Sequence, residues 1–120
     1  MIQDLNLPSK MEEIQQIAAA MHAISHPTRL KILCFLGDHE KIVNEILEHA
    51  GSTQSNISQH IEVLRKSGIL RSRRIHNRVY CSVVTADLLP IINNIQELFC
   101  ATNQQQTHLN HLEKRLKASH

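Results

Sequence analysis

Residues 52–83 read STQSNISQHIEVLRKSGILRSRRIHNRVYCSV, a helical pattern followed by two short strand-like runs. The stretch begins with a serine and a threonine, which are preferred helix caps, and then carries isoleucine and leucine at helical spacing. We therefore expect a helix over 54–67. The runs 69–75 and 78–84 have the composition of strands, and the polar pair His76-Asn77 between them predicts a hairpin.

Helices are expected on both sides of this stretch. Apolar residues recur at helical spacing over 11–25, 27–36 and 43–49, and Pro27 separates the first two segments because proline disfavours a helical residue before it. A last helix is expected from about Asp87. The predicted order is four helices, two strands and a helix: a mainly α chain with a small β-hairpin wing, which is a winged helix-turn-helix.

The length of 120 residues predicts one domain, and we expect a flexible leader over 1–10, a folded domain over 11–101 and a polar helical extension or tail over 102–120. The single tyrosine, two phenylalanines and absent tryptophan argue against a single-strand nucleic-acid binder that stacks bases on aromatic rings. No apolar run is long enough to span a bilayer, and the N-terminus does not resemble a secretory signal. We therefore expect a cytoplasmic protein without a membrane partner.

The charge is distributed unevenly along the chain. Residues 1–50 carry four Lys/Arg and seven Asp/Glu, a net charge of −3, whereas residues 51–86 carry six Lys/Arg and Glu62 alone, a net charge of +5. A basic segment inside a near-neutral chain is the footprint of a phosphate-binding surface. In a winged helix-turn-helix, the second helix of the pair enters the major groove of double-stranded DNA, and the hairpin reaches the flanking backbone or the minor groove. The expected DNA contacts are Gln54, Ser55, Asn56, Ser58, Gln59, His60, Arg65, Arg73, Arg74, His76, Asn77 and Arg78.

Three segments of the chain resemble a known family. SHPTRLKIL at 25–33, SNISQHIEVLR at 55–65 and GIL at 68–70 followed by Arg73-Arg74 are similar to the signatures of the ArsR–SmtB repressors. The resemblance covers about residues 11–101. It implies a homodimer packed through its first and last helices, a palindromic operator and an effector that releases the DNA. The apolar stripes assigned to the dimer interface comprise Ile14, Ile17, Met21, Leu88, Ile92, Ile95 and Phe99.

The metal sites of the family have no counterpart in this sequence. The segment 43–49 lacks the cysteines of the arsenic and cadmium sensors, and the last helix opens Asp87-Leu88-Leu89 without the histidine of the zinc sensors. We therefore expect no bound metal and no cofactor. A weaker alternative remains open, in which Cys100 binds a metal together with the tail histidines His108, His111 and His120.

The cysteines are the remaining candidates for an effector site. Cys34 and Cys100 are similar in place to the paired thiols of the persulfide and redox branch of the family, which includes BigR, SqrR and HlyU. That resemblance implies DNA release when a disulfide or polysulfide bridge links the two, with a reactive sulfur species or an oxidant as inducer. Two alternatives stay open: the two cysteines are buried core residues, or the repressor has no thiol switch. Cys81, on the expected wing strand, is predicted to be structural.

An enzyme would use Cys34 as a nucleophile with His26 or His39 as its base. The sequence shows no glycine-rich phosphate loop and supplies no orienting acid or oxyanion hole. We therefore expect no enzymatic activity.

Overall fold

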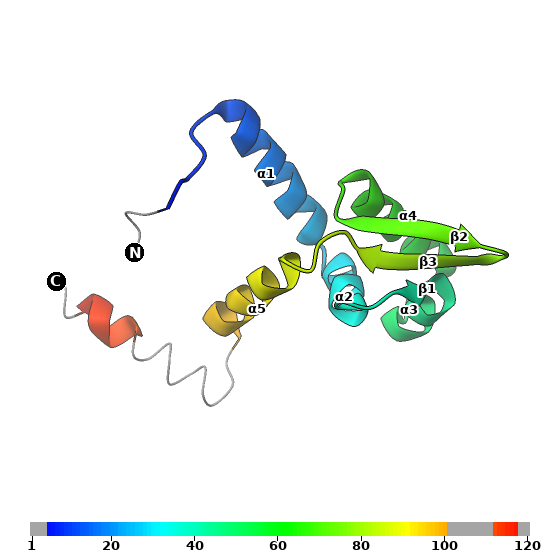
Figure 1. Cartoon of the computed structure of the whole chain (residues 1–120). Coiled ribbons are helices and arrows are strands. Elements are labelled where there is room, and N and C mark those ends of the chain that lie inside the picture. Colours follow the sequence, from blue (N-terminus) through cyan, green and yellow to red (C-terminus); the bar gives the residue numbers. More distant parts are fainter. Residues whose placement is uncertain (1–4, 101–111, 118–120) are drawn as a thin grey trace. The chain divides into compact units, whose positions relative to one another are not determined.

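The computed structural model describes residues 5–100 and 112–117. Its order of elements resembles the predicted one, with one additional short strand (Figure 1). The chain divides into two compact units, residues 1–85 and 86–120. The elements are α1 (Met11–Ile24), α2 (Pro27–Leu36), β1 (Lys41–Ile42), α3 (Val43–Ala50), α4 (Gln54–Lys66), β2 (Leu70–Ile75), β3 (Arg78–Val83) and α5 (Leu88–Phe99).

The first two helices are separated where the sequence predicted a break. His26 has an extended backbone and caps α2, since its Nδ1 accepts a hydrogen bond from the Thr28 amide at 3.1 Å. Pro27 occupies the first turn of α2, where its missing N–H costs nothing. The helix then buries Ile32, Leu33 and Leu36 on one side.

The helix-turn-helix pair consists of α3 and α4. Gly51 ends α3 with φ 67°, a left-handed conformation that glycine adopts without steric cost. Thr53 then caps α4, because its side chain accepts a hydrogen bond from the Asn56 amide at 3.2 Å. Ile57 and Leu64 fix the inward face of α4, since both are fully buried.

The wing belongs to a three-stranded antiparallel sheet in the order β1–β3–β2. The β2–β3 hairpin pairs Leu70 with Val83 through to Ile75 with Arg78, which leaves the predicted two-residue turn. His76 in that turn has φ 55°. The sequence predicted a polar loop over 38–40 and a helix from Val43, with no strand between them. In the structure, Lys41 and Ile42 form the short strand β1, which pairs with Cys81 and Tyr80 of β3.

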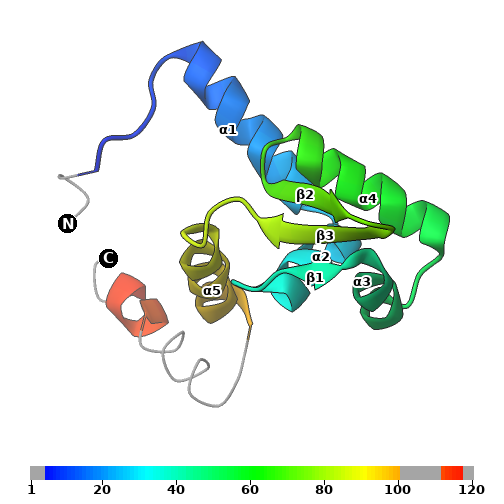
Figure 2. The same cartoon turned by 45° about the vertical axis from the view of Figure 1, so that its right-hand side comes forward.

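The core of the first unit lies between the sheet and the helices (Figure 2). Helix α4 packs against β2, while α2 and α3 pack against β3. Helix α1 contacts α2 and α4 near its own C-terminal end, where Ala23 is buried. The core is therefore built by the elements that carry the helix-turn-helix and the wing. Its fully buried side chains are Ile32, Leu33, Leu36, Ile46, Ile57, Leu64, Leu70 and Cys81.

The second unit contains α5 and a helical segment over residues 112–117. No α5 side chain is fully buried, and Leu88 and Ile92 are half-buried. Residues 101–111 lie outside the described part of the chain, as do 1–4 and 118–120. The domain boundaries expected from the sequence therefore stay predictions.

Within the described residues, no helix is both long and apolar enough to cross a membrane. The predicted fold class is confirmed: the structure is mainly helical and has a hairpin wing.

Candidate nucleic-acid interface

The first half of α4 presents short polar side chains. Gln54, Ser55, Asn56, Ser58 and Gln59 are all exposed. Asn56 is held in place, because its Nδ2 donates a hydrogen bond to Ser52 Oγ at 3.3 Å. These side chains include the donors and acceptors that read base edges in a major groove.

A groove of about 450 Å³ runs beside these residues, between α4 and the wing. It lies wholly within the first unit. The groove also receives Asn44 from the first turn of α3, a residue that the sequence analysis did not select. Its lining consists of Ile42, Val43, Asn44, Gln54, Ser58, Ile61, Glu62, Arg65, Ser72, Arg74, Asn77, Arg78 and Val79.

The wing arginines do not share one environment. Arg74 and Arg78 line the groove with α4. Within the described residues, neither guanidinium has a carboxylate within ion-pair distance. Arg73 lies elsewhere and forms a bidentate pair with Glu40, with Nε–Oε2 at 2.7 Å and Nη2–Oε1 at 2.6 Å. Of the three predicted wing cations, the structure thus brings only two to the groove.

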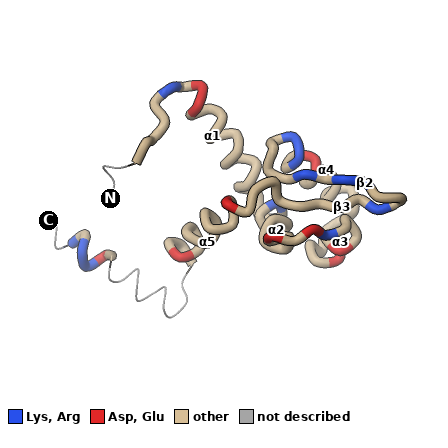
Figure 3. Tube along the Cα trace, in the orientation of Figure 1, with Lys and Arg blue, Asp and Glu red and all other residues tan. Residues whose placement is uncertain are grey.

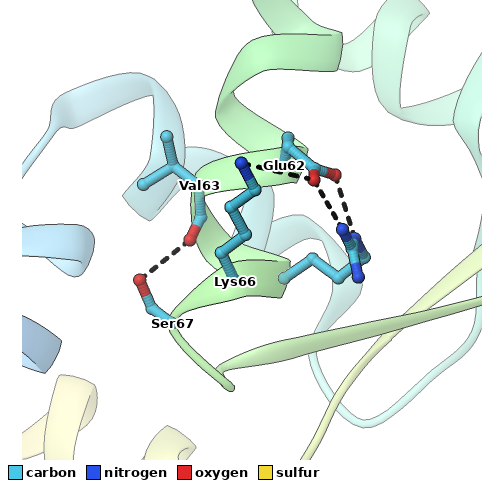
Figure 4. Close-up of polar contacts among 5 residues, drawn as sticks. Glu62, Val63, Lys66 and Ser67 are labelled. Atoms are coloured by element: carbon cyan, nitrogen blue, oxygen red, sulfur yellow. Dashed lines mark hydrogen bonds and ion pairs between the residues drawn. The ribbon is translucent and has the colours of Figure 1, made fainter.

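Arg65 enters the groove while bonded to Glu62. Its Nε and Nη2 donate to the two Glu62 carboxylate oxygens at 2.9 and 2.5 Å, and Lys66 lies 4.0 Å from the same carboxylate (Figure 4). The hydrogen bond from Arg65 and the nearby positive charges hold the pKa of Glu62 below its usual value. Ser67 closes the helix by donating to the Val63 carbonyl at 2.8 Å.

His60 has a different environment from the rest of the predicted DNA contacts. Its half-buried ring lies 4.3 Å from the His26 ring, and its Nδ1 is 3.3 Å from Arg29 Nη1. Burial lowers the pKa of His60, and the positive charges of His26 and Arg29 lower it further. His60 thus connects α4 to the start of α2. The His-Pro-Thr-Arg run carries both partners, but sequence alone does not show that α4 packs against it.

Arg29 completes this junction between three helices. Its Nε donates to the Ala23 carbonyl at 2.5 Å and its Nη2 to the His22 carbonyl at 3.4 Å, both in the last turn of α1. Since a helix C-terminus carries partial negative charge, a guanidinium is favoured there. Arg29 is a structural residue that the sequence analysis did not single out.

In the first unit, Lys and Arg residues are concentrated along α4 and the wing strands, and Asp and Glu residues around α3 and the segment before it (Figure 3). His76, at the tip of the wing, is exposed beside Asn77. The positive charge of the residues around the groove is therefore suited to a polyanion.

The three cysteines differ in accessibility. Cys34 on α2 and Cys100 at the end of α5 are exposed, and each belongs to a different unit. Cys81 is buried on β3, where burial and the charge of Glu40 raise the pKa of its thiol to about 11. This environment agrees with the structural role predicted for Cys81.

Among the described residues, no three or more His, Cys, Asp or Glu side chains are grouped closely enough to hold a metal ion. The tail histidines of the metal alternative, His108, His111 and His120, lie outside those residues.

Comparison with known proteins identifies the family to which this chain is similar. A model described as "Bacterial regulatory protein, arsR family" matches residues 26–72, which span α2 to the beginning of the wing. The biofilm growth-associated repressor of Xylella fastidiosa (strain 9a5c) is 32% identical over 90 residues, which are 75% of this chain and 79% of that protein. The chain belongs to the ArsR family.

Two further similarities extend over most of this ArsR-family chain. The transcriptional activator HlyU of Vibrio cholerae is 29% identical over 101 residues, 81% of this chain and 94% of that protein. The crystal structure of the transcriptional repressor BigR from Xylella fastidiosa has a TM-score of 0.66 and 30% identity, and covers 78% of this chain and 100% of that chain. These relatives are named as regulators rather than enzymes, in agreement with the sequence analysis. The names include both a repressor and an activator.

Proposed function

We propose that this chain is a DNA-binding transcriptional repressor, which acts as a homodimer on a palindromic operator and releases it when Cys34 and Cys100 are linked. DNA binding is supported by the groove that residues of α4 line together with Arg74 and Arg78. In this proposal Gln54 and Ser58 contact base edges, and Arg74 and Arg78 contact phosphates beside them. The remaining predicted contacts are Ser55, Asn56, Gln59, His60, Arg65, Arg73, His76 and Asn77.

Exposed apolar side chains on α1 and α5 support the homodimer. Five of the seven residues predicted for the interface are exposed, and Phe99 is 79% exposed. Apolar surface of this kind is stabilised when a second copy covers it. A two-fold dimer would also present two copies of α4 to a palindrome. The exposed set comprises Ile14, Ile17, Met21, Ile95 and Phe99, with Met11, Ile91 and Leu98 beside them.

The DNA-binding proposal is tested by selecting bound sequences from random duplex DNA and then measuring affinity against salt. For Gln54→Ala we expect a weaker preference for the selected sequence, because a good base contact is worth about 1–3 kcal/mol. For Arg74→Gln we expect weaker binding to all sequences and a salt slope smaller by about one. Lys10→Gln is the control, since it removes one exposed charge outside the groove. An unchanged salt slope in Arg74→Gln would reject this placement of the DNA.

The thiol switch has a balanced chemistry. A Cys34 or Cys100 thiolate attacks the outer sulfur of a persulfide RS–SH, which forms a protein persulfide and releases RSH. The second thiol takes up a sulfur in the same way, and the outer sulfur of one protein persulfide then attacks the protein-bound sulfur of the other, which forms a trisulfide link and releases H₂S. With hydrogen peroxide, one thiol becomes a sulfenic acid and releases water, and the second thiol displaces another water to form a plain disulfide without additional sulfur. Because both thiols are exposed, both are accessible to such reagents.

The switch is tested with serine variants and operator binding. Cys34→Ser and Cys100→Ser should each bind DNA when reduced and remain bound after a persulfide is added. Cys81→Ser is the matched control and should release DNA like the natural chain. If Cys34→Ser releases DNA after persulfide treatment as the natural chain does, the link between Cys34 and Cys100 is not the switch. The repressor then responds through another site, such as a metal site, or has no thiol switch.

A further inference from the structure

The outer face of the wing sheet carries a three-residue cluster, of which only Arg73 is among the expected DNA contacts. Arg73 on β2 forms its bidentate pair with Glu40, which directly precedes β1. The Arg73 guanidinium also lies over the Tyr80 ring, 5.4 Å from its centroid. Tyr80 is on β3, directly opposite Arg73 in one register and Ile42 in the other. The cluster therefore joins β2 and β3 to the residue that precedes β1.

On β2, strand alternation separates Arg73 from the residues that line the groove. Ser72 and Arg74 line the groove, and successive side chains of a strand point to opposite faces. Arg73 lies between them in sequence and pairs with Glu40 instead. Arg71 has the same parity as Arg73, and its Nη2 donates to the Val84 carbonyl at 2.9 Å. On β2, Arg71 and Arg73 therefore lie on one face and Arg74 on the other, whereas Arg78 lines the groove from the end of the hairpin, where it pairs with Ile75.

The position of Glu40 gives the pair a mechanical role. Glu40 precedes the two residues of β1, and β1 leads directly into α3, the first helix of the helix-turn-helix. The hairpin is joined to β1 through only two residue pairs, Lys41 with Cys81 and Ile42 with Tyr80. A fork-shaped guanidinium on a carboxylate adds two directional hydrogen bonds to this short junction. The pair therefore connects the wing to the segment that begins α3.

The electrostatics agree with a formed pair. The hydrogen bond and charge of Arg73 lower the pKa of Glu40, and those of Glu40 raise the pKa of Arg73. A phosphate would have to compete with this carboxylate for the same guanidinium.

We propose that Glu40, Arg73 and Tyr80 form a clamp that orients the wing, and that Arg73 is a positioning residue which makes no phosphate contact. The inference rests on the proposed DNA-binding function and changes one of its expected contacts. Arg74 and Arg78 then supply the phosphate contacts of the wing. The opposite possibility is that Arg73 pairs with Glu40 only in the free protein, and that a DNA phosphate replaces the Glu40 carboxylate when the operator binds.

Salt dependence of operator affinity separates these possibilities. Arg73→Gln and Glu40→Gln should each weaken binding by about two- to fivefold with an unchanged salt slope, because an exposed pair contributes little and no phosphate contact is lost. The double variant should be no weaker than either single variant. Arg74→Gln, one residue away, is the matched control and should lower the slope by about one. A slope that falls in Arg73→Gln as in Arg74→Gln, or tighter binding with a steeper slope in Glu40→Gln, would overturn the clamp.

Arg73→Lys tests geometry apart from charge. Lysine keeps the positive charge but lacks the planar fork that binds a carboxylate twice. The clamp predicts that Arg73→Lys behaves like Arg73→Gln. Binding equal to that of the natural chain would show that the charge alone matters and would contradict the clamp.

Tyr80 offers a readout that needs no DNA, because it is the only tyrosine in the chain. With ring-labelled tyrosine, NMR should show its resonances shifted in free Arg73→Gln and Glu40→Gln, and unshifted in Arg74→Gln. In the natural chain the resonances should keep their positions when operator is added. Movement to the Arg73→Gln positions on DNA binding would mean that Arg73 leaves the clamp for a phosphate. If no groove variant affects DNA binding, the proposed function fails, while the free-protein spectra still test the clamp.

Discussion

The His60 ring lies beside two groups that carry or can acquire positive charge, His26 and Arg29. Protonation of His60 would add a third positive charge at this junction and would turn its Nδ1 from a possible acceptor into a donor. The lowered pKa of His60 follows from that cost and from burial. The protonation state of His60 is therefore linked to the stability of the contact between α4 and α2.

The pH dependence of unfolding tests this linkage. Since the pKa of His60 is lower in the folded chain than its ordinary 6.5, the unfolded chain binds more protons as the pH falls past 6.5. The stabilisation should be complete above about pH 6.5 and should be lost as the pH falls through the folded pKa. Denaturant unfolding from about pH 7.5 to pH 5 should show a smaller decline in His60→Gln than in the natural chain. His39→Gln, an exposed control, should decline normally. Equal declines in all three proteins would contradict the assignment.

Thiol labelling tests the difference among the three cysteines. With a pKa of about 11, only about one Cys81 thiol in a thousand is ionised near pH 8, and the side chain is also buried. Iodoacetamide should therefore modify Cys34 and Cys100 in the native chain and leave Cys81 unmodified until denaturant is added. Peptide mass spectrometry locates the label. Rapid native labelling of Cys81 would contradict its buried position.

For individual residues, the sequence predicted which side chains are exposed on a helix better than which partners they contact. The polar residues of α4 were recognised because Ile57 and Leu64 fix which side of the helix is buried. The different positions of His60 and Arg73 could not be predicted, since their partners Arg29 and Glu40 are separated from them by 31 and 33 residues. Only the packing of α2 against α4 and the register of β3 bring those groups together.

Among the elements, α4 depends on the cap at its start. Thr53→Ala removes the acceptor for the Asn56 amide and should lower the free energy of unfolding by about 1 kcal/mol. Ser55→Ala, two residues further along the chain, is the control and should have a smaller effect. Chemical denaturation of both variants measures the difference. Equal losses would show that the Thr53 cap does not stabilise α4.

The boundaries of the helices and the hairpin followed local signals that single residues provide. Pro27 fixes the beginning of α2, and Gly51 and Thr53 fix the turn before α4. Strand β1 had no such signal, because two residues cannot show an alternating pattern. It exists through its pairing with β3, which is a tertiary contact.

For the whole molecule, the homodimer depends on the apolar surface of α1 and α5. Ile95 is 52% exposed, and Ile95→Glu should convert the dimer to monomers and abolish tight operator binding, because a buried unpaired charge is costly. Asn94→Glu, on the adjacent exposed position of α5, should remain dimeric. Sedimentation analysis of both variants gives the oligomeric state. A dimeric Ile95→Glu would place the interface elsewhere.

The thiol switch involves both units of the chain, since Cys34 and Cys100 lie on separate units. Sequence could pair them only through a resemblance, because spacing along the chain does not determine the distance between two helices. The most direct test treats the reduced chain with glutathione persulfide and, separately, with hydrogen peroxide, and measures peptide masses and operator binding on the same samples. We expect a peptide pair joined through Cys34 and Cys100 in the fraction that has released DNA, with additional sulfur in the link only after persulfide treatment. DNA release without that link, or a linked dimer that still binds its operator, would contradict it.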